Sequence, residues 1–120
     1  MITNFETLTN ELTEIEMQML DRLVIGFKNY TKSNPIKEPD IVKRFNERNN
    51  TKLTGVRLRK LVNHIRTNGI IPLIATSKGY YVSYDEEEIK NQIKSLKQRA
   101  SSIENCANGL LKFTYKSSLY

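Results

Sequence analysis

The sequence has few of the residues on which catalysis and metal binding depend. It contains one cysteine, one histidine and no tryptophan in 120 residues. The lone Cys106 excludes an internal disulfide, and Cys106 and the lone His64 together are too few soft ligands for a typical zinc site. A Ser/His/Asp set would have a single histidine to draw on, and neither a Walker loop nor a GxGxxG motif occurs. We therefore expect no enzyme, no metal and no cofactor.

Long hydrophobic runs are also missing. No stretch approaches the roughly 18 consecutive apolar residues of a membrane span. The opening sequence MITNFETLTNEL lacks the basic and apolar regions of a signal peptide. With 38% hydrophobic residues, 120 residues are enough for one small globular domain. We expect a cytoplasmic protein with no membrane partner and no small-molecule substrate.

Acidic residues are absent from the centre of the chain. Between Glu47 and Asp85 the only charged residues are Arg48, Lys52, Arg57, Arg59, Lys60, Arg66 and Lys78. Residues 35–84 hold ten bases and three acids, a balance of +7, whereas residues 1–34 (three bases, five acids) and 85–120 (six bases, five acids) have −2 and +1. A polyanion is the natural partner of such a segment. A metal-dependent nuclease would need clustered carboxylates in the same region, and none occur there.

The stretch from Thr54 to Arg66 predicts an amphipathic helix. Thr54 is the expected N-cap, and Gly69 is the expected stop just past the last periodic residue. One stripe of this helix, at positions i, i+3, i+4 and i+7, is apolar and should face a core; it consists of Leu58, Leu61, Val62 and Ile65. The opposite face contains no acidic residue and carries Val56, Lys60, Asn63 and Thr67, flanked by Arg57, Arg59 and His64.

This basic face predicts contacts to double-stranded DNA. Asn63 can form a bidentate pair with adenine, Arg57, Arg59 or Lys60 can bind guanine or phosphate, and Val56 can touch a thymine methyl group. For Asn63 and His64 taken singly, an ordinary exposed helix surface is an equally good interpretation. The predicted DNA-binding residues are Lys52, Thr54, Val56, Arg57, Arg59, Lys60, Asn63, His64 and Lys78.

Two helices are expected before this one. Thr13 and Glu16 match a capping box, and a first helix from about Glu14 to Lys32 should bury Ile15, Met19, Leu23, Phe27 and Tyr30. A second helix should run from Glu38, with Pro39 in its first turn, to about Arg48. The polar residues 49–52 form a tight turn, so the order is helix, turn, basic helix, which is a helix-turn-helix.

A change of period after Gly69 predicts a β-hairpin. Ile70 to Thr76 and Tyr80 to Tyr84 are short β-favouring runs, joined by the turn sequence Ser77-Lys78-Gly79. Pro72 cannot donate to a ladder and should occupy an edge position. Lys78 should lie at the tip of the hairpin.

The last helix is expected from Glu86 to Leu111, with Asp85 as its cap. At 1.5 Å per residue it would be about 39 Å long, more than a domain of this size can cover. A heptad seam of apolar residues therefore predicts a homodimer, whose interface begins after Ile89 with Ile93, Leu96, Ala100, Ile103, Ala107 and Leu110. The alternative is a bend near Ser101 and Ser102 that folds the helix back on the first one.

The order of these elements resembles a winged helix-turn-helix domain over about Thr13 to Tyr84. The resemblance implies that the third helix enters the major groove and that the hairpin, or wing, touches the neighbouring backbone through Lys78. The stretch LTGVRLRKLVNHIRTNG, followed by IATSKGYYV and a long heptad helix, also resembles small winged-helix proteins encoded by bacteriophages. That likeness implies that the protein acts in the cytoplasm of a bacterial host cell.

Together these patterns predict a mainly α protein with a small β-hairpin. Residues 1–12 form an expected flexible arm, 13–84 the winged helix-turn-helix domain, 85–112 the dimerisation helix and 113–120 a flexible tail. The expected function is non-enzymatic binding of double-stranded DNA as a dimer, in a regulator or a replication or packaging factor. The alternative is a protein-interaction module that binds a host or phage protein through the basic face.

Overall fold

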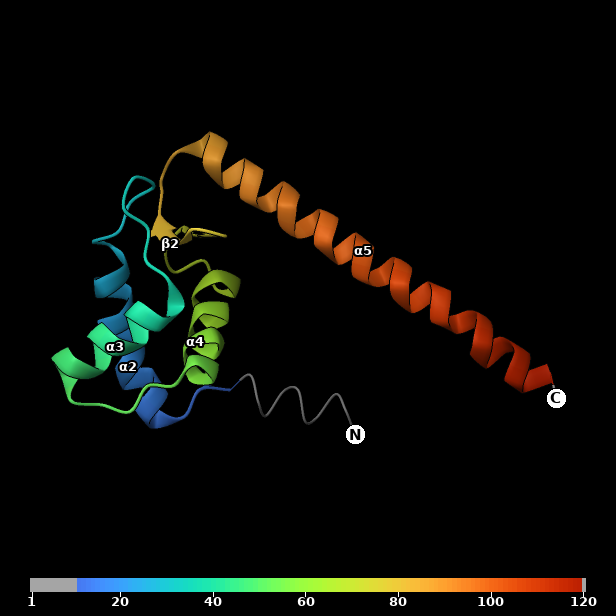
Figure 1. Ribbon diagram of the computed structural model, residues 1–120, viewed down its shortest axis with the longest axis horizontal. Coiled ribbons are helices and arrows are strands. Elements are labelled where there is room, and N and C mark those ends of the chain that lie inside the picture. The colour runs from blue at the N-terminus through green and yellow to red at the C-terminus, as the bar shows by residue number, and fades with distance from the viewer. Residues whose placement is uncertain (1–10, 120) are drawn as a thin grey trace. The chain divides into compact units, whose positions relative to one another are not determined.

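The computed structural model describes residues 11–119, with side chains as far as residue 114. These residues form two units, one ending at Tyr84 and the other beginning at Asp85. The first unit contains three helices followed by an antiparallel β-hairpin, and the second is one long helix (Figure 1). The chain is therefore mainly α-helical with a small hairpin, as predicted. Residues 1–10 of the expected N-terminal arm lie outside the described residues.

The first helix of the described residues, α2 (Glu14–Phe27), begins at the predicted capping box. The Thr13 hydroxyl accepts a hydrogen bond from the Glu16 backbone N–H at 3.2 Å, and the Glu16 carboxylate accepts one from the Thr13 N–H at 2.9 Å. The predicted burial of Ile15 is wrong, because 58% of this residue is exposed. Glu16, beside it, is buried instead.

The predicted end of this helix at Lys32 is also wrong, since α2 ends at Phe27. The backbone carbonyl of Tyr30 accepts a hydrogen bond from the Val82 N–H at 3.1 Å. The Tyr30 N–H donates to the Phe27 carbonyl at 3.0 Å, three residues back instead of four, so the α-helical ladder has already ended there. The helix therefore ends about one turn earlier than the apolar pattern indicated, and Tyr30 pairs with the hairpin instead.

The helices α3 (Glu38–Asn49) and α4 (Gly55–Thr67) are joined by a turn that one side chain holds in place. The side-chain amide of Asn46 accepts a hydrogen bond from the Leu53 N–H at 2.7 Å and donates one to the Leu53 carbonyl at 2.9 Å. Asn50 adopts a left-handed conformation with φ 50°, which asparagine tolerates better than most residues. The predicted order of helix, tight turn and helix is confirmed.

Both ends of α4 are capped where the sequence predicted. The Thr54 hydroxyl accepts a hydrogen bond from the Arg57 N–H at 3.2 Å. At the other end Gly69 has φ +60°, and the N–H groups of Ile70 and Gly69 donate to the carbonyls of Ile65 and Arg66 at 3.0 and 3.3 Å. These two bonds form a Schellman motif, which stops the helix.

The core of the first unit is built around α4. Leu58, Leu61 and Ile65 on its apolar stripe have no exposed surface. The stripe packs in one cluster with residues of α2 and α3, among them Leu23, Phe27, Ile41 and Phe45. Burying each such side chain contributes about 1.5–3 kcal/mol. This packing fixes α4 to the unit and leaves its opposite face in solvent.

The hairpin consists of β1 (Leu73–Thr76) and β2 (Gly79–Val82). Thr76 pairs with Gly79, so the turn is Ser77 and Lys78 only, one residue shorter than predicted. Gly79 has φ +127°, and a Cβ built there would lie 2.5 Å from the Ile36 carbonyl oxygen. The next residue, Tyr80, exchanges backbone hydrogen bonds with Ile36 at 2.8 and 2.9 Å. Glycine therefore permits the segment before α3 to join the hairpin.

The second unit is α5 (Glu86–Leu119), a helix of 34 residues (Figure 1). The Asp85 carboxylate accepts hydrogen bonds from the N–H groups of Glu87 and Glu88 at 2.8 and 3.3 Å, so Asp85 caps the helix as predicted. The predicted end at Leu111 is wrong. No glycine or proline follows Leu111, and the helix continues through most of the expected tail.

The apolar seam of α5 is exposed to solvent in the single chain. Exposure is 46% at Ile93, 70% at Ile103 and 68% at Leu110. The helix is continuous through Ser101 and Ser102, where the alternative interpretation placed a bend. Across the described part of the chain, none of the helices has the length and apolar content that a membrane span requires.

Candidate nucleic-acid interface

The outward face of α4 offers polar and basic side chains along its whole length. Val56 is 71% exposed, and Arg59, Asn63 and Thr67 are exposed as well. Among the described residues, Asn63 has no side-chain hydrogen bond, so its amide remains available for a ligand. Thus the structure presents to solvent most of the residues predicted on this face.

Two of the predicted DNA-binding cations are tied to a buried carboxylate. Glu16 is only 3% exposed. One of its carboxylate oxygens accepts a hydrogen bond from Lys60 Nζ at 2.8 Å, and the other accepts one from Arg57 Nε at 3.1 Å. The side chains of Lys60 and Arg57 are 24% and 37% exposed. The N-terminal turn of α2 therefore holds both cations at the surface of α4.

Glu16 is ionised over the whole physiological range. Burial on its own raises the pKa of this carboxyl, but hydrogen bonds from Lys60 and from the Thr13 N–H, together with the charge of Lys60, outweigh it and lower the pKa from 4.5 to about 2. Each cation thus retains a charged partner at neutral pH. Lys60 Nζ has two further N–H donors and Arg57 has both terminal nitrogens with which to reach a ligand.

A third predicted contact residue, Arg59, pairs with Glu38 at the start of α3. The first residue of α4, Gly55, makes room for this pair, since a Cβ there would lie 2.9 Å from Glu38 Oε1. Residues 52–78 carry six bases and no acid, and Glu16 and Glu38 cancel two of those charges, leaving +4 on this part of the surface. The charge is lower than the helix alone suggested.

The remaining predicted residues occupy three different settings. Lys52 and Thr54 are exposed in and just after the turn before α4, and Lys78 is exposed at the hairpin tip. His64 is half-buried, and its backbone carbonyl accepts a hydrogen bond from the Asn68 side chain at 2.9 Å. The predicted dimerisation residues all belong to α5, in the other unit.

Glu16 and Glu38, which pair with the cations of α4, were not predicted from the sequence. Glu16 precedes Met19 by three residues and Leu23 by seven, so it falls on the same stripe of α2 as the buried apolar residues. A carboxylate at such a position needs a cation as its partner. That signal was present in the sequence, but the identity of the partner was not.

The described residues contain no group of three or more His, Cys, Asp or Glu side chains placed to hold a metal ion. Cys106 is exposed on α5 and forms no disulfide. No protein-family model, curated protein or solved structure matches the chain.

Proposed function

We propose that this protein is a winged helix-turn-helix protein that binds double-stranded DNA without catalysis. One observation carries the proposal: α4 is anchored by a fully buried apolar stripe, while its opposite face is exposed and has only basic charge of its own. A helix held in this way fits the major groove, and α3 with the tight turn supplies the helix-turn-helix frame. The hairpin after α4 corresponds to the wing.

The residues of the face have different roles in this proposal. Asn63, whose amide has no hydrogen bond within the described residues, contacts a base edge. Val56, which is apolar and exposed, does the same. Lys60 and Arg57 reach the DNA with the donors that Glu16 leaves free, and Lys78 contacts a phosphate from the hairpin tip. Base contacts specify the sequence, whereas phosphate contacts position the protein.

The second part of the proposal is that α5 joins two copies of the chain. Its exposed apolar seam repeats every seven residues, and a second copy of the same helix offers the complementary surface. Small residues in the seam, Ala100 and Ala107, allow two helices to approach closely. A dimer presents two α4 helices and requires a two-part, palindromic site.

The decisive experiment is selection of bound fragments from a random DNA library at two salt concentrations. We expect one enriched palindromic motif. If the surface charge of +4 neutralises about four phosphates, log affinity should fall against log salt with a slope of about −4. Retention of all sequences alike would contradict base recognition, and no binding at low salt would contradict DNA binding altogether.

One observation favours a second function, binding of an acidic protein surface. Three cations of α4 already pair with carboxylates of the same chain. Arg57 and Lys60 pair with Glu16, and Arg59 pairs with Glu38. An acidic partner would use the same donors that we assign to phosphate. Failure of DNA binding at low salt, with the basic face still required for a partner, would favour this function.

A further inference from the structure

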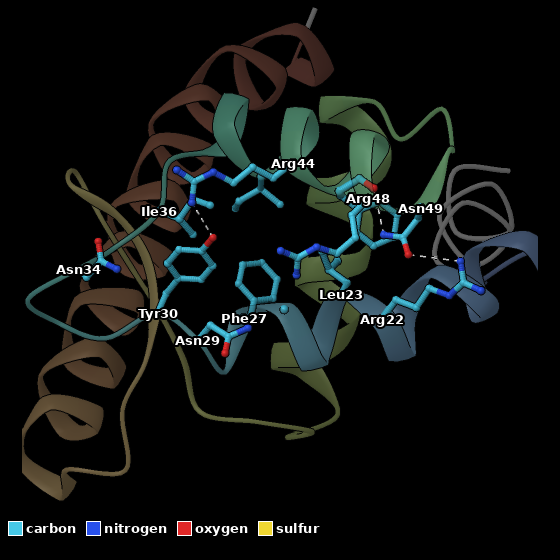
Figure 2. A pocket seen from close by; sticks show the side chains of 13 residues that line it. Arg22, Leu23, Phe27, Asn29, Tyr30, Asn34, Ile36, Arg44, Arg48 and Asn49 are labelled. Atoms are coloured by element: carbon cyan, nitrogen blue, oxygen red, sulfur yellow. Dashed lines mark hydrogen bonds between the residues drawn. The ribbon is translucent and has the colours of Figure 1, made fainter.

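A cavity of about 510 Å³ lies in the first unit, between the second half of α2, the segment that follows it, and α3. Figure 2 shows this pocket, with side chains from all three segments around it. None of its lining residues belongs to α4 or to the predicted DNA-binding set. Its volume falls in the usual range of small-molecule sites, about 300–1,000 Å³.

The cavity exists because of how the helices pack. Both α2 and α3 pack on α4, and they meet each other only sparsely. Gly26 lines the cavity from α2, and a Cβ built there would meet nothing within 4 Å. Open space is therefore left where a larger residue would have projected.

The floor of the cavity is apolar and belongs to the buried core. It is formed by Leu23, Phe27 and Phe45, together with Ile36 and Ile41, and all five belong to the buried core. The Phe27 ring also packs edge-on against Tyr80, with 5.9 Å between the ring centroids. An apolar group entering the cavity would contact aromatic and aliphatic side chains that are already held in place.

The rim of the cavity is cationic. Arg22, Arg44 and Arg48 line it, and no aspartate or glutamate is among the described residues that do so. In Figure 2 the side chains of Arg44 and Arg48 extend from α3 over the space beside Tyr30 and Phe27. Three guanidinium groups around an apolar floor suit a ligand that combines an anion with an apolar body.

The three arginines are not equally engaged. Arg44 donates a hydrogen bond to the Tyr30 hydroxyl at 2.9 Å, and Arg22 donates one to the Asn49 side chain at 3.3 Å. Arg48 has no hydrogen bond or ion pair within residues 11–119, so its whole fork of donors is available. The hydrogen bond with Tyr30 raises the pKa of Arg44, as do the charges of Asp40 and Glu47, so Arg44 remains cationic.

We propose that this cavity binds a small organic anion, a phosphate or carboxylate carried on an aromatic or other apolar body. The apolar body covers Phe27 and Leu23, and the anion pairs with Arg48 and Arg44 at the rim. Guanidinium groups match phosphate and carboxylate oxygens through two parallel hydrogen bonds. No residue of α4 lines the site, so this proposal does not rest on the proposed DNA binding.

The test uses four probes in titrations of the full-length ¹⁵N-labelled protein: phenyl phosphate, phenylacetate, inorganic phosphate and benzyl alcohol. We expect phenyl phosphate or phenylacetate to shift the amide signals of Gly26, Asn29 and Asn49, with a Kd of about 1 mM or tighter. The better of these two probes tells whether phosphate or carboxylate is preferred. Inorganic phosphate and benzyl alcohol should each bind at least about tenfold more weakly, since each lacks one half of the ligand.

Three variants localise the binding. Arg48→Gln should weaken it about fivefold or more through loss of a charge-assisted pair. Lys43→Gln removes the same charge from an exposed position of α3 outside the cavity and should change the Kd less than about twofold. Gly26→Leu should fold as the wild type, because the site is open, and should abolish binding by filling the mouth of the cavity.

Four results would overturn the proposal. The first is the absence of shifts at the cavity with both aromatic anions at 10 mM, which is about ten times the expected Kd. The second is binding of inorganic phosphate that is as tight as that of the aromatic anions. The third is equal weakening by Lys43→Gln and Arg48→Gln. Either result would indicate attraction to diffuse positive charge instead of binding in the cavity. The fourth is tighter binding of a fluorescein-labelled Glu-Glu-Phe-Glu-Glu peptide than of either aromatic anion, which would assign the cavity to a protein partner.

Discussion

Two apolar stripes with nearly the same spacing have opposite fates in this protein. On α4, Leu58, Leu61 and Ile65 are completely buried within the chain. On α5, Ile103 and Leu110 remain 70% and 68% exposed. Periodicity therefore predicts that a helix has a face to bury, but not whether the same chain covers it. The difference separates a helix whose apolar face its own domain buries from one whose apolar face stays exposed in the single chain.

The largest expected effect comes from the stripe of α4. Leu61→Ala should lower the free energy of unfolding of the first unit by about 3–5 kcal/mol, because the side chain is fully buried and leaves a cavity. Urea denaturation followed by circular dichroism measures the change. The matched control is Leu110→Ala on α5, which should alter the first unit by less than about 0.5 kcal/mol. Equal losses in the two variants would contradict the division between the stripes.

The next largest effect is expected for Glu16, the buried carboxylate that pairs with two cations of α4. Glu16→Gln should lower the free energy of unfolding by about 3 kcal/mol at pH 7, since the pKa of Glu16 is lowered from 4.5 to about 2 in the folded protein. The wild type has this stabilisation in full above about pH 4.5 and loses it as the pH falls toward 2. Urea midpoints between pH 6 and pH 3 should therefore fall more steeply for the wild type than for the variant. The matched control is Glu14→Gln, an exposed residue of the same turn.

A smaller effect, on DNA affinity, should distinguish substitutions on α4 from a substitution in the hairpin. Asn63→Ala and Lys60→Ala should each cost about 1–3 kcal/mol of binding to the selected DNA site and change the preferred sequence. Lys60→Ala should in addition lower the free energy of unfolding, because Lys60 pairs with the buried Glu16 carboxylate. Lys78→Ala should weaken binding to all sequences alike, because a phosphate contact carries no base information. Competition binding with the selected site and its single-base variants measures both. A uniform loss in all three variants would argue against base recognition by α4.

The smallest effect on folding, and the sharpest test of the comparison, is expected on α5. Ile103→Asp should leave the unfolding of the first unit unchanged within about 0.5 kcal/mol, because this residue is 70% exposed in the single chain. In sedimentation at tens of micromolar the wild type should be a dimer and the variant a monomer with weaker DNA binding. A wild type that sediments as a monomer would remove the dimer from the proposal.

Local sequence was enough to place α4 and both of its ends. Thr54 caps the helix and Gly69 stops it, because a hydroxyl acceptor and a residue free to take positive φ act within one turn of the chain. The same holds for Asp85 at the start of α5 and for the hairpin near Lys78. The exposure of Val56 and Asn63 also followed from the helical period alone.

Tertiary structure decided the features that depend on distant partners. The helix α2 ends at Phe27, and the Tyr30 backbone beyond it pairs with Val82, a partner that no local signal in the sequence names. The cations of α4 looked free in the sequence, yet Glu16 and Glu38 reach them across 41 and 21 residues of chain. The cavity between α2 and α3 likewise results from how two helices meet a third. Hydrogen bonds and caps within one turn are determined by neighbouring residues, whereas charge pairing and packing between elements depend on which surfaces the folded chain brings together.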